Sequence, residues 1–194
     1  MQDRRIIKTK KNIKNALISL LAEKNFEKIS VTEICDRAKV SRISFYAHYK
    51  DKYELVEFIF SDYVREAYHD YRLMQKENVD NDPLRAYDNL LESILNLYFK
   101  NIDFFTYATA TKNPYLYSLF YSHMFGIVRG FVRSNKDFMP KYHPRQTAAF
   151  LCNGFWGMIS ECNAEKVPEE TTRANVKALC RDLLESDVFN YSGE

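Results

Sequence analysis

Residues 41–48, which read SRISFYAH, have side chains of the types that contact DNA bases and phosphates. Arg42 can donate two parallel hydrogen bonds to a guanine, and Ile43 can contact the methyl group of a thymine. Ser44 and Tyr46 can reach base edges or phosphate oxygens. An apolar Ile beside Arg in a basic segment is unusual for a helix face that only meets water. The pattern therefore favours contact with DNA.

The same residue types also occur in roles unrelated to DNA. Arg42 could be an ordinary surface arginine, Tyr46 could be half-buried in a core, and His48 could be a structural histidine bonded to a neighbour. For a single residue the structural interpretation would be preferred. The combination of all three within one short basic segment favours contacts to bases or phosphates.

Three consecutive helices are expected to position this segment. Apolar residues recur at helical spacing between residues 9 and 24 and predict an amphipathic helix. Ser30 and Glu33 have the spacing of a capping box, which predicts the start of a second helix. Ser41 can cap a short third helix. If the first two helices pack together, the third presents its outer face, as the second helix of a helix-turn-helix motif does in the major groove.

The rest of the chain also has helical periodicity. Further helices are expected near residues 52–71, 83–100, 103–111, 114–133, 144–165 and 168–184. The chain has only five Gly and five Pro, which is few for an all-β fold rich in turns. We expect an all-α protein of about nine helices. Its predicted domains are residues 1–52, a three-helix DNA-binding domain, and residues 53–194, a helical domain for dimerisation and ligand sensing.

The charge of the chain is unevenly distributed. The net charge is +2, but residues 1–52 carry 13 Lys and Arg against 6 Asp and Glu. Residues 53–194 carry 15 basic against 20 acidic side chains. A basic N-terminal part joined to an acidic C-terminal part indicates that the first faces a polyanion and the second does not.

Residues 29–55, from ISVTEICDRAKV through SRISFYAHYKDKYEL, resemble the DNA-binding signature of the TetR/AcrR family of bacterial regulators. The resemblance covers about residues 9–60. It implies that Tyr46, His48 and Lys52 hold phosphates, together with the amides at the start of the fourth helix. It assigns base contacts to the start of the third helix. The complete set of DNA-binding residues that we expect is Ser30, Thr32, Ser41, Arg42, Ile43, Ser44, Tyr46, His48 and Lys52.

One residue departs from the family's pattern. Lys39 stands in the turn where the family most often has Gly. A side chain at this position requires a left-handed backbone conformation, at a cost of about 1 kcal/mol. The departure does not change the expected motif.

The resemblance implies that the protein is a homodimeric repressor whose operator is an inverted repeat and which a small apolar or aromatic ligand releases from DNA. Paired helices near 144–165 and 168–184 would form the dimer interface. Aromatic residues of the C-terminal domain are the candidates for a ligand pocket, although a packed aromatic core is the alternative. The predicted pocket residues are Phe104, Tyr107, Tyr117, Phe120, Tyr121, His123, Phe155 and Trp156. A second hypothesis replaces the ligand by a protein partner that docks on the C-terminal domain.

Other function classes are disfavoured. The sequence has no Gly-rich phosphate loop, no nucleophile elbow and no metal-ligand spacing, so we expect neither an enzyme nor a metal or cofactor site. Cys152 and Cys162 would lie about 15 Å apart on one helix, too far for a disulfide-based redox switch. No apolar run is long enough to span a membrane and no signal peptide is recognisable, which favours the cytoplasm.

Overall fold

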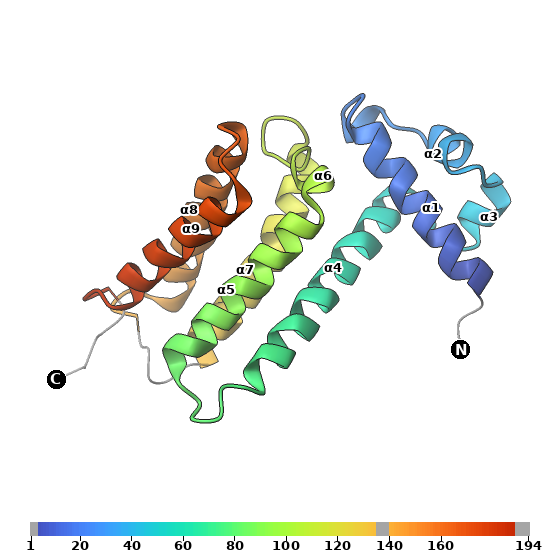
Figure 1. Ribbon diagram of the computed structural model, residues 1–194. Coiled ribbons are helices and arrows are strands. Elements are labelled where there is room, and N and C mark those ends of the chain that lie inside the picture. The colour runs from blue at the N-terminus through green and yellow to red at the C-terminus, as the bar shows by residue number, and fades with distance from the viewer. Residues whose placement is uncertain (1–3, 135–139, 189–194) are drawn as a thin grey trace. The chain divides into compact units, whose positions relative to one another are not determined.

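The computed structural model describes residues 4–134 and 140–188, and these residues form an all-α fold (Figure 1). This confirms the predicted fold class. The described residues contain nine α-helices and one short 3-10 helix, η1. Their bounds are α1 Arg4–Leu21, η1 Phe26–Lys28, α2 Val31–Ala38, α3 Arg42–Tyr46, α4 Lys52–Gln75, α5 Pro83–Lys100, α6 Ile102–Phe105, α7 Pro114–Ser134, α8 Pro144–Ala164 and α9 Glu169–Leu184.

Most helix ends lie where the sequence placed them because local chemistry determines them. Pro83, Pro114 and Pro144 each begin a helix, where the missing N–H of proline is not needed. The helix predicted for residues 103–111 is shorter, and α6 ends at Phe105. The reason lies downstream, because the Asn113 side chain donates to the Tyr107 carbonyl at 2.8 Å and holds residues 107–113 as a loop.

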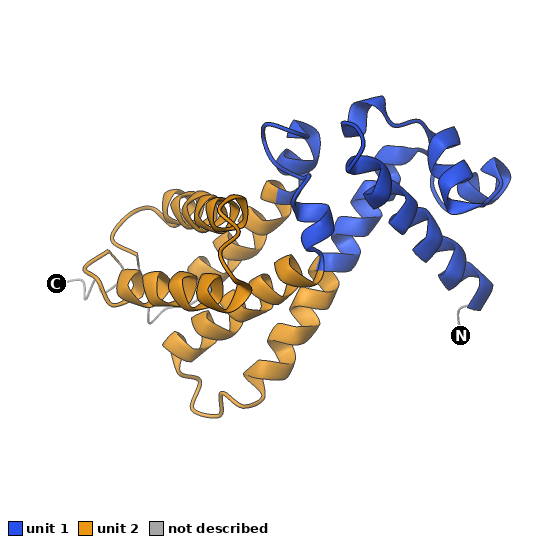
Figure 2. Cartoon of the chain, turned by 45° about the horizontal axis from the view of Figure 1, so that its top comes forward, with its two compact units in different colours: residues 1–63, 101–120 blue, residues 64–100, 121–194 orange. Residues whose placement is uncertain are grey.

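The chain divides into two compact units, residues 1–63 with 101–120 and residues 64–100 with 121–194 (Figure 2). The first unit thus holds more than the predicted DNA-binding domain of residues 1–52. Two contacts explain this: the Phe60 ring packs edge-on against Phe104 at 5.3 Å, and the Phe26 amide donates to Asn113 at 2.6 Å. The assignment of DNA binding to residues 1–52 and of sensing to residues 53–194 stays a prediction.

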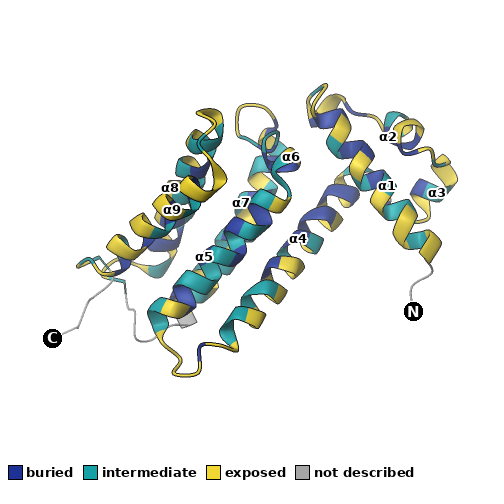
Figure 3. Cartoon of the chain, in the orientation of Figure 1, coloured by how far each residue is buried: buried dark blue, intermediate teal, exposed yellow. Residues whose placement is uncertain are grey.

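The core of the first unit is built from the apolar face of α1 and from aromatic rings. Ile13 and Leu17 of α1 are fully buried, as are Phe45 of α3 and Phe60 of α4. The opposite faces of α1 and α3 are exposed (Figure 3). α1 and α2 therefore form a support on which α3 is held by one face only.

In the second unit, α9 is joined to α5 by ion pairs as well as by apolar packing. Arg173 contacts Glu92 at 3.0 Å, and Arg181 contacts Asp88 at 3.1 Å. Val176 and Leu184 of α9 are buried beside these pairs. None of the described helices is long and apolar enough to cross a membrane. The described residues also contain no cluster of three or more His, Cys, Asp or Glu that could hold a metal ion.

Candidate nucleic-acid interface

Helix α3 presents three of the predicted DNA-binding side chains to solvent. Ile43 is 84% exposed and Tyr46 is 49% exposed, while Phe45 between them is fully buried. Arg42 is also exposed, and its guanidinium carbon lies 5.9 Å from the centre of the Tyr46 ring. The buried Phe45 anchors the helix, so that the exposed side chains of Arg42, Ile43 and Tyr46 lie on its outer face. The geometry suits insertion of this face into a major groove.

Residues 39–41 connect α2 to α3, and both ends of this connection are capped. Lys39 has φ 55° and ψ 46°, the left-handed conformation expected of the residue that replaces Gly. Its amide donates to the carbonyls of Cys35 and Asp36 and closes α2. Ser41 accepts a hydrogen bond from the Ser44 amide at 3.0 Å and opens α3. These two caps fix the angle between the helices of the motif.

The other predicted contact residues lie around α3 and differ in their exposure and in the hydrogen bonds they already make. Thr32 on α2 is exposed, whereas Ser44 and His48 are half-buried. Ser30 is exposed, but its hydroxyl serves the expected capping box, accepting from the Glu33 amide and donating to the Glu33 carboxylate at 2.8 Å. The Ser30 hydroxyl therefore stabilises the start of α2. Contact of Ser30, Thr32, Ser44 and His48 with DNA stays a prediction.

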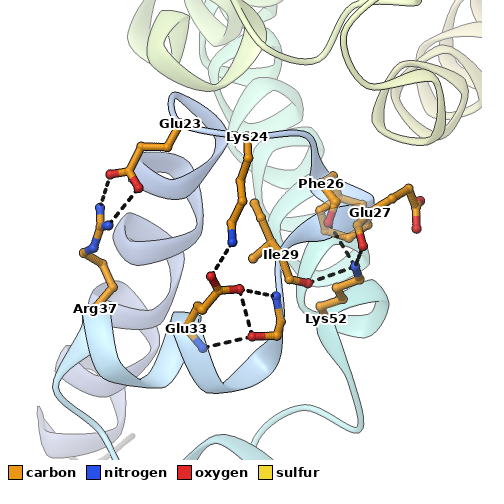
Figure 4. Close-up of polar contacts among 9 residues, drawn as sticks. Glu23, Lys24, Phe26, Glu27, Ile29, Glu33, Arg37 and Lys52 are labelled. Carbon is orange, nitrogen blue, oxygen red and sulfur yellow. Dashed lines mark hydrogen bonds and ion pairs between the residues drawn. The ribbon is translucent and has the colours of Figure 1, made fainter.

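Lys52 makes contacts within the first unit that its sequence position did not indicate. Its ammonium group donates to the carbonyl oxygens of Phe26, Glu27 and Ile29, each at 2.9 Å (Figure 4). An ammonium group has three N–H donors, so these bonds use all of them. Burial lowers the pKa of Lys52, with the nearby Glu27 carboxylate acting in the opposite direction. Lys52 thus ties the start of α4 to the loop that precedes α2, and its contact with a phosphate stays a prediction.

The start of α4 is likewise occupied by the protein's own side chains. The Asp51 carboxylate accepts from the amides of Tyr53 at 2.9 Å and Glu54 at 2.8 Å. The Glu54 carboxylate in turn accepts from the Lys50 amide. The two amides that a phosphate would bind at this helix end are therefore already bonded to the Asp51 carboxylate, which is negatively charged like a phosphate. A phosphate at this helix end would have to displace the Asp51 carboxylate, and the expected phosphate site stays a prediction.

Two ion pairs join α2 to the loop that follows α1 (Figure 4). Arg37 donates to the Glu23 carboxylate with both terminal nitrogens, at 2.8 and 3.0 Å. Lys24 donates to Glu33, whose pKa is lowered to about 2, first by this bond and then by the bonds from Ser30. Glu33 thus serves the helix cap and the tertiary contact together.

The second unit contains a cavity of about 480 Å³ between residues of α4, α5 and α7. Its lining is apolar or aromatic apart from one serine and the phenol groups of two tyrosines. The lining residues are Val64, Ala67, Tyr68, Tyr71, Ala86, Leu90, Ser93, Ile94, Leu97, Met124, Ile127, Gly130 and Phe131. This volume lies within the range of small-molecule pockets.

None of the eight residues predicted for a ligand pocket lines this cavity. Phe104 and Phe120 instead pack in the core of the first unit, where both rings lie against Phe60. Trp156 packs edge-on against Tyr98 at 5.7 Å. Tyr121 lines a second pocket of the same unit, between α7 and α8, and ligand contact by the eight residues stays a prediction. The remaining members of the predicted set are Tyr107, Tyr117, Tyr121, His123 and Phe155, all half-buried.

Small residues would have given a better signal for the cavity than aromatic ones. Ala67, Ala86 and Gly130 recur on three helices that face it. A Cβ atom added at Gly130 would meet no atom within 4 Å. The sequence shows such residues plainly, but only the packing of the three helices reveals which of them leave space.

The four cysteines are free, and burial makes Cys35, Cys152 and Cys180 poor nucleophiles. Burial raises the pKa of Cys152 and of Cys180 to about 12 and also raises that of Cys35. A thiol of such high pKa forms little of the reactive thiolate. These values agree with the low expectation for a cysteine-based redox switch.

The family model described as bacterial regulatory proteins, tetR family, matches residues 13–59, from α1 into α4. The HTH-type transcriptional regulator YxbF of Bacillus subtilis is 40% identical over 50 residues, which are 26% of this chain and 13% of that relative. Residues 13–59 thus carry the sequence pattern of the tetR family of bacterial regulatory proteins.

Solved TetR-family structures have the same fold over nearly the whole chain. A TetR-family transcriptional regulator of Syntrophomonas wolfei has a TM-score of 0.76 at 12% identity, covering 92% of this chain and 96% of that one. A TetR regulator of Streptococcus agalactiae has a TM-score of 0.58 at 24% identity, covering 91% and 96%. The similarity thus extends from the matched DNA-binding segment to the fold of the helical remainder.

Proposed function

We propose that this protein is a TetR-family regulator that binds a specific DNA operator as a homodimer and represses transcription until a small ligand releases it. The observation that carries the proposal is the outward face of α3, where Arg42, the 84% exposed Ile43 and Tyr46 project from a basic helix-turn-helix. A large exposed apolar side chain flanked by Arg and Tyr is suited to read base edges. A DNA target in a bacterium also implies action in the cytoplasm.

The proposed dimer uses α8 and α9. Phe150, Gly154 and Gly157 recur at i, i+4 and i+7 on α8, and all three are exposed, Phe150 by 60%. Leu179 on α9 is 40% exposed. Glycines beside a large apolar side chain allow two helices to approach closely. A single helix-turn-helix reads few bases, so pairing two copies on an inverted repeat provides the specificity that one copy lacks.

The proposed ligand site is the cavity between α4, α5 and α7. Its lining contains no Asp, Glu, Lys, Arg or His. The Ser93 hydroxyl already donates to the Leu90 carbonyl at 2.7 Å. A charged ligand would lose its hydration there without gaining a partner of opposite charge. The cavity therefore favours an uncharged apolar ligand, and its presence favours ligand control over control by a protein partner alone.

The decisive experiment is selection of bound duplexes from a random DNA pool at a fixed salt concentration. Wild-type protein is compared with Arg42→Ala, Tyr46→Ala and the control Arg72→Ala, which removes the same charge from an exposed site of α4 outside the motif. Enrichment of an inverted repeat by wild type and by the control, but not by the other two variants, is expected. Binding that is equal in all four proteins and depends only on salt would contradict sequence-specific recognition.

A further inference from the structure

Phe26, in the turn between α1 and α2, is held through its backbone and its ring. The residue is 1% exposed, and its amide donates to the Oδ1 atom of Asn113 at 2.6 Å. Its carbonyl accepts from Lys52 at 2.9 Å. Its ring stacks on Tyr115, with centroids 5.6 Å apart and planes 7° apart, and meets Tyr53 edge-on at 5.4 Å. Residues from the starts of α4 and α7 thus fix this turn.

Asn113 is itself fixed, so that it can act as a rigid support. It is 4% exposed, its Nδ2 donates to the Tyr107 carbonyl at 2.8 Å, and its amide donates to the Thr109 carbonyl at 2.9 Å. Only one orientation of the carboxamide places nitrogen on a carbonyl and oxygen on an amide. The bonds of Asn113 to the Tyr107 and Thr109 carbonyls therefore direct its Oδ1 atom at the Phe26 amide.

The turn that Asn113 holds leads directly into the DNA-binding motif. Phe26 accepts from the Ile29 amide at 3.0 Å, and the next residue, Ser30, caps α2. A buried amide without an acceptor is costly, so loss of Asn113 would oblige the Phe26 turn to rearrange or to open. Any such movement is passed to α2, and through its capped connection to α3.

We propose that Asn113, at the start of α7, is a positioning residue for DNA binding, because its carboxamide holds the turn that orients the helix-turn-helix. Asn113 lies 87 residues from Phe26 in the sequence and outside the segment that matches the family model. It touches neither base nor phosphate in this role. The inference rests on the proposed function, since it assigns the residue a part in operator affinity.

The test compares Asn113→Ala and Asn113→Asp with a matched control, Asn78→Ala. Asn78 is also buried, at 6% exposed, and holds a loop through the same kind of bonds, with the Asp82 amide at 3.0 Å and the Asp82 carbonyl at 2.9 Å. That loop joins α4 to α5 in the second unit. Two quantities are measured: amide hydrogen exchange at Phe26 in the free protein, and the dissociation constant for the duplex that wild type selects.

Asn113→Ala is expected to speed exchange at Phe26 about tenfold and to weaken duplex binding about tenfold, the factor for one lost hydrogen bond of ordinary strength. Asn113→Asp keeps the acceptor oxygen for the Phe26 amide but loses the donor to the Tyr107 carbonyl, so it should restore only part of both. Asn78→Ala should change exchange only around Asp82. Tyr115→Leu, which removes the stacked ring from a half-buried site, should speed exchange at Phe26 even if Asn113→Ala fails to fold.

Unchanged exchange at Phe26 in both Asn113→Ala and Tyr115→Leu would overturn the inference. Equal losses of duplex affinity in Asn113→Ala and Asn78→Ala would do the same, because they would show only general destabilisation. A wild-type protein that selects no duplex would instead overturn the proposed function. The exchange measurement needs no DNA, so the two failures are distinguishable.

Discussion

Tyr49 is buried directly behind α3, and its hydroxyl is buried with the ring. The side chain is 2% exposed, and its oxygen has no hydrogen-bond partner among the described residues. Burial, with smaller contributions from Asp62 and Glu54, raises the pKa of Tyr49 to about 12. The ring therefore stabilises the motif while the hydroxyl destabilises it.

We predict that Tyr49→Phe raises the free energy of unfolding by about 1 to 3 kcal/mol, the cost of an unsatisfied buried polar group. Urea denaturation monitored by circular dichroism measures this. The control is Tyr53→Phe, which removes a hydroxyl that donates to Glu27 at 2.7 Å and should leave stability equal or lower. A Tyr49→Phe variant no more stable than wild type would show that the hydroxyl is satisfied in solution.

Glu33 gives the first unit a stability that depends on pH. Its folded pKa of about 2 lies below the ordinary value of 4.5, so the ionised carboxylate is favoured by folding. Its contribution is complete above pH 4.5 and is lost as the pH falls towards 2. We predict that Glu33→Gln melts below wild type at neutral pH, and that the difference in Tm shrinks across this window. A difference in Tm that is constant with pH would refute the assignment.

At the scale of elements, the left-handed backbone conformation of Lys39 in the α2–α3 connection destabilises the protein, and a substitution can relieve this. Lys39 has a positive φ of 55°, which a residue with a Cβ adopts at a cost of about 1 kcal/mol. We predict that Lys39→Gly stabilises the protein by about that amount in chemical denaturation. Lys39→Ala, which removes the charge and keeps the Cβ, should not. Equal effects of the two substitutions would attribute the gain to charge instead.

The elements were predictable wherever their cause is local in the sequence. Ser30 and Glu33 form the expected capping box, and proline begins α5, α7 and α8. Contacts between distant residues were not predictable. Nothing near Lys52 in the sequence indicates that three carbonyls of residues 26–29 occupy its ammonium group. The same holds for the cavity, because its existence depends on how α4, α5 and α7 pack and not on the aromatic content of the chain.

At the scale of the whole molecule, the proposed ligand class can be tested with 1-decanol, decanoate and decylammonium, which share a chain and differ in charge. We predict that 1-decanol binds most tightly in calorimetry. Gly130→Leu should weaken its binding about tenfold or more by filling the cavity.

Gly126→Leu is the control for this test. Gly126 lies one turn earlier on α7, also has no atom within 4 Å of an added Cβ, and does not line the cavity. Both variants gain similar helix propensity. Tighter binding of decanoate, or equal binding by the two variants, would contradict the assignment of the cavity.

The proposed dimer predicts that Phe150→Asp is monomeric in sedimentation equilibrium at concentrations where wild type is dimeric. A carboxylate at the centre of an apolar helix face would have to be desolvated on association. The control Tyr142→Asp changes another large exposed side chain, 56% exposed and outside α8, and should leave the dimer intact. A Phe150→Asp variant that still dimerises would remove α8 from the interface.

The division of the chain into units has a consequence for building chimeric regulators. The first unit is discontinuous: it consists of residues 1–63 and 101–120, and its two boundaries within helices fall inside α4 and α7. A designer who transplants only the N-terminal segment onto another sensor leaves the Phe26 amide without Asn113. A transplant that keeps DNA recognition would need two pieces, the N-terminal segment and the α6–α7 connection, inserted at separate points of the recipient. The unit that carries the helix-turn-helix therefore cannot be exchanged as one continuous segment of sequence in this fold.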